Sequence, residues 1–392
     1  MRSDVTIIGG GPAGLAMALS LDALGLSVTV LERAPHAALA DPDFDGREIA
    51  LTHHSVSALR ASGAWARIPA IGVSPLREAR VETGRRNRPL TFDTRGRGVD
   101  ALGYLVSNHL IRRALYQEAV SRSGITLRAG VATRRVRTDR DRVTVLAEGG
   151  DIETRLAIAA DGRFSDIRRL HGIGAVTHDF HRAMLVCRMA HESPHHHVAL
   201  QWFDQGQTVA LLPVNGSASS LVLTLPPDHI ANLRAMERDA FNAEIMARIG
   251  NRLGAMRLVS TRHVYPLCAV YAHRFTASRF ALIGDAAVGM HPITAHGFNL
   301  GLKGQEILTQ EIAAGLARHG DPGAAASLRR FEMRHRMATA PLFAATNGIA
   351  TLYTRDDPPF RHLRAAGLRV ADSLAPFKAA VTSMLMDDKK TA

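Results

Sequence analysis

The sequence predicts an α/β protein in which a Rossmann-like nucleotide-binding domain is joined to a smaller β-sheet substrate domain and a helical C-terminal segment. Three observations predict this fold. The chain opens with a strand, a glycine-rich turn and a helix; a second strand, turn and helix return near residue 280; and the intervening region alternates apolar and polar residues. A chain of 392 residues is long enough to bury more than one core.

The first 32 residues are predicted to form a βαβ unit. Residues 5–8 are apolar and β-branched, residues 9–14 are rich in glycine, and residues 15–24 are good helix formers. Residues 27–31 supply a second strand at once. The two strands are therefore expected to be parallel and covered by helices.

The later elements follow from the same periodicities. Helices are expected at 52–66, 108–122 and 236–250, and short strands are expected within 124–146 and 176–262. A late strand at 279–283 precedes a helix at about 298–317.

The nucleotide-binding domain is predicted to be discontinuous, because its two strand-turn-helix units are separated by the strand-rich region. Its expected parts are 1–72, 101–175 and 262–330; the substrate domain would comprise 73–100 and 176–261, and the C-terminal helical segment 331–392.

Composition and charge narrow the class of protein. The formal charge of +12 comes mainly from arginines scattered along the chain, and no nucleic-acid-reading motif accompanies them, so nucleic-acid binding is not expected. No stretch reaches the roughly 20 apolar residues of a spanning helix, and the first residues do not resemble a secretion signal. Cys187 and Cys268 cannot make a disulfide framework. We therefore expect a cytoplasmic protein.

A phosphate-binding turn is predicted near the start of the chain. Gly9, Gly11 and Gly14 fit the pattern G-x-G-x-x-G, with Pro12 and Ala13 between the last two glycines. Glycines at this place allow a tight turn and let a pyrophosphate approach the backbone, while the helix that follows supplies N–H donors and a positive dipole.

Glu32 is the matching candidate for the sugar of a dinucleotide. It lies 18 residues after Gly14, at the end of the second strand, with Arg33 beside it. A carboxylate there can accept hydrogen bonds from both ribose hydroxyls of an adenosine. The alternative is a solvated acid at a strand end.

Two later motifs distinguish FAD from NAD. Residues 160–168 (ADGRFSDIR) match D-G-x-x-S-x-x-R, and residues 283–301 contain G-D-A, H-P and G-x-N-x-G in that order. With these motifs, the sequence resembles the aromatic-hydroxylase class of FAD monooxygenases over residues 1–330, and specifically the ubiquinone-biosynthesis hydroxylases. The string GMHPITAHGFNLGL looks most like the UbiM branch. The resemblance implies a p-hydroxybenzoate-hydroxylase-like domain of the glutathione-reductase type.

The resemblance implies a role for each matching residue. The glycines of the first turn would hold the FAD pyrophosphate, and Glu32 would bind the ribose. Arg47 would lie against the phosphates, Asp161 near the pyrophosphate, and Asp285 on the ribityl chain. The backbone N–H groups of Phe298 and Asn299 would face the flavin N1 and O2 edge, and Gly297 would let the backbone pass close to the ring. The expected cofactor residues are Gly9, Gly11, Pro12, Ala13, Gly14, Glu32, Arg33, Arg47, His109, Asp161, Gly284, Asp285, Pro292, Gly297, Phe298 and Asn299.

Several of these positions have a simpler alternative. The family often has arginine where His109 stands, which leaves the flavin contact at His109 open. Asp161 and Asp285 could be ordinary turn formers, and Arg47 could be a surface arginine.

The resemblance implies hydroxylation of the aromatic ring of a polyprenylated phenol or quinol, a ubiquinone precursor such as demethoxyubiquinol, by dioxygen through a flavin C4a-hydroperoxide. His291 and His296 flank the loop and could assist phenol deprotonation, or could serve only in packing. No second G-x-G-x-x-G occurs between a strand and a helix. NAD(P)H would therefore visit the flavin transiently, or a partner protein would deliver electrons.

Two other functions stay open on the same fold. One is a flavin-dependent reductase of an isoprenoid lipid. The other is a non-catalytic scaffold or lipid-binding subunit that joins other quinone-biosynthesis proteins.

Two further segments have competing interpretations. Residues 360–386 alternate basic and apolar residues, so they are expected either to lie peripherally on the inner membrane, where a polyprenylated substrate resides, or to pack on their own domain. Residues 191–197 contain four histidines, but neighbouring side chains on a strand point to opposite faces. No metal site is expected there.

Overall fold

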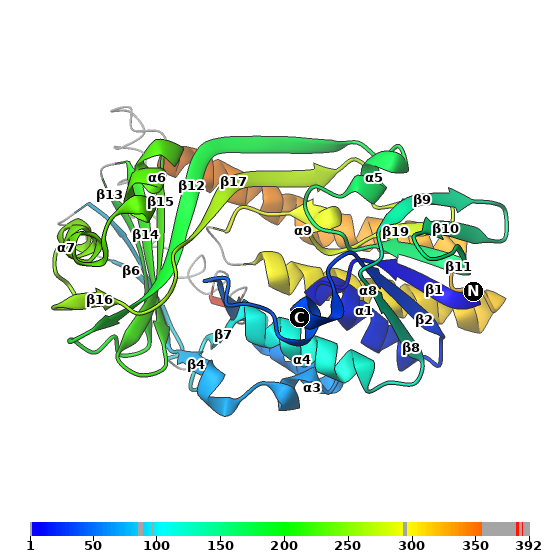
Figure 1. The fold of residues 1–392 in the computed structure, drawn as a ribbon, viewed down its shortest axis with the longest axis horizontal. Coiled ribbons are helices and arrows are strands. Elements are labelled where there is room, and N and C mark those ends of the chain that lie inside the picture. The colour runs from blue at the N-terminus through cyan, green and yellow to red at the C-terminus, as the bar shows by residue number, and fades with distance from the viewer. Residues whose placement is uncertain are drawn as a thin grey trace.

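The structure of the protein is a computed structural model that describes residues 2–84, 89–95, 98–204, 206–292, 296–354, 382–383 and 386. Figure 1 shows a nine-stranded sheet on the left and an eight-stranded sheet with its helices on the right. The long strands β12 and β17 run across the top between these two regions. The predicted α/β class is confirmed.

The eight-stranded sheet contains the predicted βαβ unit. Its order is β18-β19-β11-β1-β2-β8, and β10 and β9 continue from β11. The strands from β19 to β8 along this path are parallel. The bounds are β1 Arg2–Ile8, β2 Val28–Glu32, β8 Ile125–Ala129, β9 Thr133–Thr138, β10 Val143–Ala147, β11 Ile152–Ala159, β18 Thr276–Ala277 and β19 Phe280–Leu282.

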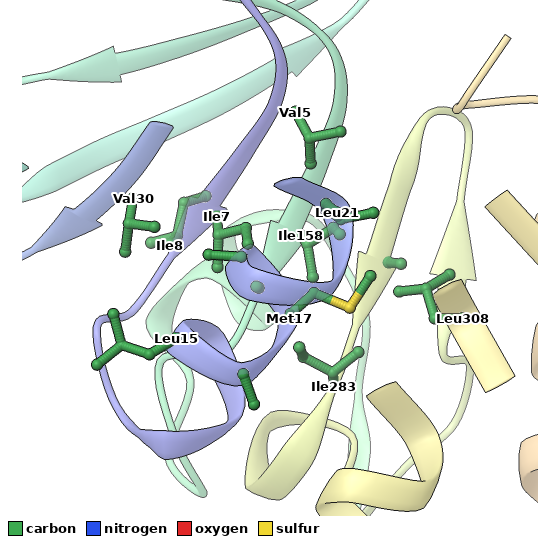
Figure 2. Packing of buried hydrophobic residues seen from close by; sticks show 14 of the residues in the cluster. Val5, Ile7, Ile8, Leu15, Met17, Leu21, Val30, Ile158, Ile283 and Leu308 are labelled. Carbon is green, nitrogen blue, oxygen red and sulfur yellow. The ribbon is translucent and has the colours of Figure 1, made fainter. Parts of the chain in front are cut away.

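Helices pack on this sheet because its central strands are apolar on both faces. Figure 2 shows Ile7 of β1 close to Met17 of the first helix, α1, and Leu308 of α8 belongs to the same cluster of buried residues. The helices of this region are α1 Pro12–Asp22, α2 His36–Ala40, α3 His53–Ala61, α4 Asn108–Val120, α5 Asp166–Leu170, α8 Gly297–His319 and α9 Ala325–Thr354; the 3-10 turns are η1 Ala64–Arg67, η2 Ala70–Gly72 and η3 Gly284–Ala286.

The helix predicted at 52–66 is instead two pieces, α3 and η1. Gly63 separates them with a φ of +85°, a left-handed conformation that ends an α-helix. The side chain of Thr52 caps α3 by accepting the N–H of Ser55.

The nine-stranded sheet is built largely from the strand-rich region. Its order is β20-β17-β12-β15-β14-β13-β5-β6, with β16 paired to β12. The bounds are β5 Glu78–Thr83, β6 Leu90–Asp93, β12 Ala175–His191, β13 Val198–Asp204, β14 Gln207–Val214, β15 Ala218–Leu225, β16 Met256–Leu258, β17 His263–Ala272 and β20 Val288–Gly289; helices α6 Pro227–Ala235 and α7 Arg238–Ile249 cover it.

The division of the chain into two domains stays a prediction. The nine-stranded sheet extends past residue 261, because β17 pairs with β12 from Ala175↔Ala272 to Val186↔His263. A small third sheet has the strand order β3-β7-β4. Its strands are β3 Glu48–Leu51, β4 Val73–Leu76 and β7 Gly103–Ser107.

The C-terminal part of the chain is helical as far as the structure describes it. Helix α9 spans 30 residues, and no described helix is long and apolar enough to cross a membrane. Most of residues 360–386, for which either an interfacial helix or a helix packed on its own domain was expected, lies outside the described residues. Met386 is buried beside Leu90, Phe92 and Leu102.

Candidate functional site

The sequence motifs converge on one edge of the eight-stranded sheet. Strands β1, β11 and β19 are neighbours and parallel, so their carboxyl ends meet. Gly9 follows β1, Asp161 follows β11, and the Gly284–Asp285 turn follows β19. Ligands of open α/β sheets bind at such an edge.

The glycines of the first motif have different surroundings. Gly9 has a φ of +113°, and a Cβ there would lie 2.4 Å from the carbonyl oxygen of Ala160. A Cβ on Gly14 would lie 1.9 Å from the carbonyl oxygen of Gly9. These two glycines are required by the fold itself.

Gly11 differs because a Cβ on it would meet no described atom within 4 Å. Gly11 is the N-cap of α1, and no described side chain caps this helix start. Pro12 and Ala13 form the first turn of α1. An open space in front of uncapped N–H groups is what an anionic pyrophosphate needs.

Glu32 lies beside the glycine turn. Its Oε2 accepts the N–H of Gly10 at 2.6 Å, and its Oε1 accepts the N–H of Ala34 at 2.8 Å. A carboxylate has about four lone-pair sites, so both oxygens keep capacity for ribose hydroxyls. Arg33 is exposed.

Asp161 anchors the second motif. Its carboxylate accepts the hydroxyl of Ser165 and, at 3.2 Å, the N–H of Ile167. Ser165 in turn caps α5 by accepting the N–H of Arg168 at 2.9 Å. The structure therefore shows turn chemistry at Asp161, and its role near the pyrophosphate stays a prediction.

Arg168 ties the second motif to the third. Its buried guanidinium donates to the carbonyl oxygen of Ala286 at 2.8 Å. Burial lowers the pKa of Arg168, and the neighbouring Arg169 lowers it further, whereas Asp161 opposes that shift.

Arg163 is the partner of Asp285, and it was not among the residues predicted for the site. Its Nη2 donates to Asp285 Oδ2 and to the carbonyl oxygen of Met290, each at 3.1 Å. Its Nη1 donates to the carbonyl oxygen of Cys268 at 2.6 Å. One guanidinium thus connects the Asp285 turn, strand β17 and the segment before His291. Its position within the D-G-x-x-S-x-x-R motif could have identified it as a residue of the site.

The third motif also contacts the first. Gly284 has a φ of +57°, and a Cβ on it would lie 2.8 Å from the Cβ of Ala13 in α1. Gly301 of α8 packs over it, since its Cβ position lies 3.8 Å from the Cα of Gly284. The three motifs, at residues 9–14, 160–168 and 283–301, are far apart in sequence but form one continuous surface, which we call the glycine wall.

The start of α8 repeats the features of the start of α1. A Cβ on Gly297 would meet no described atom within 4 Å, and the side chain of His296 does not cap the helix. Phe298 is half-buried and Pro292 is exposed. A glycine without neighbours at its Cβ position, at the N-terminal end of a helix, suits a flavin ring that lies close to the backbone.

The side chain of Asn299 has a structural role that the sequence did not predict. Its Oδ1 accepts the N–H of Thr52 at 3.2 Å, and its Nδ2 donates to the carbonyl oxygen of Ala50 at 2.8 Å. Asn299 therefore ties the first turn of α8 to the connection between β3 and α3.

Arg47 lies at the surface, with its side chain 44% exposed, and is paired with the carboxylate of Asp45. Its Nη2 lies 2.5 Å from Asp45 Oδ2, and its guanidinium lies 5.4 Å from the ring centre of Tyr265. Burial alone would lower the pKa of Arg47, but the hydrogen bond and charge of Asp45 raise it overall, with a smaller contribution from Asp285. Arg47 thus carries a positive charge in the neighbourhood of the Asp285 turn.

His109 lies at the start of α4, with its ring edge-on to Phe44 at 5.5 Å. Burial and then the positive charges of Arg188 and Arg113 lower the pKa of His109. At neutral pH the positive charge beside His109 therefore comes from Arg188 and Arg113, and neither was predicted from the sequence.

The two candidate catalytic histidines are both buried. His291 packs edge-on against Phe180 at 4.5 Å, and burial, with the charges of Arg163 and His178, lowers its pKa to about 4. His296 precedes α8. A neutral His291 at pH 7 cannot donate a proton as an imidazolium, and the assignment of a catalytic role to either histidine stays a prediction.

The pH dependence of the free energy of unfolding should reflect the burial of His291. Because the pKa of His291 is about 4 in the folded state and 6.5 in the free side chain, the unfolded chain binds more protons between these pH values. We expect the free energy of unfolding to fall as the pH drops from 6.5 to 4, by up to about 1.4 kcal/mol per pH unit for this group. The His291→Gln variant should show a shallower fall in urea unfolding at each pH.

His335 provides the internal comparison for that measurement. Burial lowers its pKa to about 4 as well, and it lies on α9, so the His291→Gln variant should keep the part of the pH dependence that comes from His335. An unchanged slope in His291→Gln would contradict the assigned pKa.

The histidines of residues 191–197 do not form a metal centre in the described structure. His195, His196 and His197 lie in a turn between β12 and β13, so our argument from strand geometry was wrong. The ring centre of His195 lies 5.7 Å from that of His191 and 5.4 Å from that of His197, but other partners engage the ring nitrogens. His191 bonds to Ser193 and Ser219, and His195 bonds to the carbonyl oxygens of Val214 and Gly216. Among the described residues, no group of three or more candidate ligands could hold an ion.

Comparison with known proteins gives a consistent picture. A family model described as "FAD binding domain" matches residues 2–339. The chain is 41% identical over 390 residues to ubiquinone hydroxylase UbiM of Neisseria meningitidis serogroup C, covering 98% of this chain and 85% of that protein. It is 32% identical to ubiquinone hydroxylase UbiL of Rhodospirillum rubrum, covering 96% and 87%.

A solved structure confirms the fold. The crystal structure of p-nitrophenol 4-monooxygenase PnpA from Pseudomonas putida DLL-E4 superposes with a TM-score of 0.77, at 18% identity and 99% coverage of both chains.

Proposed function

The chain belongs to the FAD-binding-domain family of flavoprotein monooxygenases, and from its relatives within that family we propose that it hydroxylates the aromatic ring of a ubiquinone precursor. It is an FAD-dependent monooxygenase, and its substrates are that quinone precursor and dioxygen. The predicted function and the predicted cofactor FAD are thereby confirmed.

One observation of this structure carries the assignment of the cofactor site. Gly11 immediately precedes α1 and Gly297 is the first residue of α8, and a Cβ on either would meet no described atom within 4 Å. The two helix starts are linked through Gly284, which contacts Ala13 of α1 and Gly301 of α8. Two uncapped helix starts on one wall suit a ligand with an anionic middle and an electron-accepting ring at one end. The residues present therefore fit FAD.

Each part of the wall has a proposed task. Gly11 and the first turn of α1 would bind the pyrophosphate, and Glu32 would bind the adenosine ribose. Asp285, held by Arg163, would bind the ribityl chain. When bound, FAD supplies the chemistry that activates dioxygen. The protein's own contribution at the ring is the start of α8, whose N–H groups and dipole would stabilise negative charge.

The electron donor and the route to the lipid substrate are also proposals. We infer that NAD(P)H or a partner protein reduces the flavin from outside, because no second dinucleotide motif occurs in the sequence. A polyprenylated substrate resides in a bilayer, so we infer a peripheral contact with the membrane surface or with other quinone-biosynthesis proteins.

The test is a single-turnover reaction of the purified protein. FAD-loaded protein would be reduced without oxygen, mixed with a short-chain demethoxyubiquinol, and exposed to isotopically labelled dioxygen. We expect a hydroxylated ring that carries one labelled oxygen atom. Saturation of the isoprenoid chain without label would favour the reductase alternative, and a protein that binds no flavin would favour the scaffold alternative.

A further inference from the structure

A buried ion pair joins the nine-stranded sheet to the small β3-β7-β4 sheet. Arg188, on β12, donates from Nε and Nη2 to Oε1 of Glu48, at 2.9 and 2.6 Å. Its Nη2 also lies 2.5 Å from the hydroxyl of Ser107, which donates to Oε2 of Glu48 at 2.9 Å. The Glu48 side chain is 2% exposed, whereas that of Arg188 is 32% exposed.

The ion pair contacts the two segments that carry Arg47 and His109, the candidate cofactor residues outside the glycine wall. Glu48 directly follows Arg47, and Ser107 is the N-cap of α4, two residues before His109. The guanidinium of Arg188 lies 4.9 Å from the ring centre of Phe44, and that ring also contacts His109 and His263. Arg188 therefore contacts Glu48, Ser107 and Phe44, which flank the candidate cofactor residues in sequence.

Stability alone is a weak reason for such a pair. Removing charges from water costs energy that their attraction repays only in part, and apolar replacements are often as stable. Burial raises the pKa of Glu48 overall, and the charge and hydrogen bond of Arg188 offset part of that shift. The geometry offers a second reason, because Arg188 donates to Oε1 of Glu48 while the hydroxyl of Ser107 donates to Oε2, so both carboxylate oxygens are held in place.

We propose that Arg188 is a positioning residue that holds the segment from Phe44 to Glu48 and the start of α4 against the nine-stranded sheet, so that Arg47 and His109 keep their places beside the flavin. This inference rests on the proposed function. Its consequence is that reductant consumption stays coupled to hydroxylation only while Arg188 is in place.

A set of three variants separates positioning from stability. Arg188→Gln leaves Glu48 buried without its cation, Glu48→Gln removes the charge but keeps the shape, and the double variant removes both charges. We expect Arg188→Gln to lower the melting temperature of the apoprotein and the double variant to recover most of that loss, because no unpaired buried charge remains.

The decisive readouts are FAD affinity and coupling. In the double variant, despite its recovered melting temperature, we expect the FAD dissociation constant to rise about fivefold and a larger share of reductant to end as hydrogen peroxide. The Arg188→Lys variant should recover part of the coupling, because lysine keeps the charge but not the two-atom geometry.

The matched control is a second ion pair, between Glu82 on β5 of the nine-stranded sheet and Arg252 in the turn after α7. Arg252 lies 2.5 Å from Glu82 and 4.6 Å from the ring centre of Trp202, with no contact to the segments of Arg47 or His109 in the described structure. The Arg252→Gln variant should keep wild-type FAD affinity and coupling.

Two results would overturn the proposal. One is wild-type FAD affinity and coupling in the stable double variant; the other is an equal loss in Arg252→Gln. Both are distinct from failure of the proposed function, in which the wild-type protein itself would hydroxylate nothing.

Discussion

Replacing Gly14 by alanine is expected to abolish FAD binding by destabilising the fold, whereas replacing Gly11 by alanine should weaken FAD binding without destabilising the fold. A Cβ on Gly14 would lie 1.9 Å from the carbonyl oxygen of Gly9, and neither backbone can move away within the βαβ unit. Overpacking of this kind costs about 3 kcal/mol or more. We expect a protein that is largely insoluble or that unfolds at a much lower temperature.

The Gly11→Ala variant should fold normally, because Gly11 has a φ of −74° and a Cβ there meets no described atom within 4 Å. The methyl group would instead enter the space assigned to the pyrophosphate. We expect FAD affinity to fall about a hundredfold, equivalent to ~2.7 kcal/mol. The measurement is a fluorescence titration of apoprotein with FAD, beside a thermal melt.

The control for Gly11→Ala is Gly348→Ala on α9. A Cβ at Gly348 also meets no described atom within 4 Å, but this helix position is far from the glycine wall in sequence and outside the site. It should leave FAD affinity unchanged. Normal FAD binding by Gly11→Ala would mean that the cofactor does not lie against the start of α1.

The Arg163→Gln variant is expected to have the second largest effect. It removes the cation beside Asp285 and leaves the carbonyl oxygens of Cys268 and Met290 without this donor. Hydrogen bonds to charged groups contribute about 1.5–3 kcal/mol each, and the partial exposure of Asp285 reduces its share. We expect FAD affinity to fall at least about tenfold, together with a changed visible spectrum of bound flavin.

Arg279 offers the matched control for Arg163. It makes a two-atom contact with Asp321 at 3.0 and 2.9 Å, in the same half of the protein but outside the glycine wall. The Arg279→Gln variant should lower the melting temperature without lowering FAD affinity. Equal losses of FAD affinity in the two variants would show that Arg163 acts only through general stability.

Much of the fold was predictable because its signals are local. The alternation of β-branched residues, the glycine turn and the helix formers of residues 5–31 depend only on neighbours in the chain, and β1, α1 and β2 appear where they were expected. The order of the three motifs was sufficient to identify the family. Errors occurred where one residue overrode a pattern, as Gly63 did in splitting the helix at 52–66.

The sequence by itself determined the fold class, the cofactor and the family, since glycine spacing and motif order directly reflect what a pyrophosphate and a flavin require of the backbone. Only the tertiary structure decided which side chains hold those motifs in place. Arg163 meets Asp285 across 122 residues of chain, and Arg188 meets Glu48 across 140. The first pair depends on β11 and β19 ending side by side, and the second on β12 lying against β3. No periodicity in the sequence records such contacts between segments far apart along the chain.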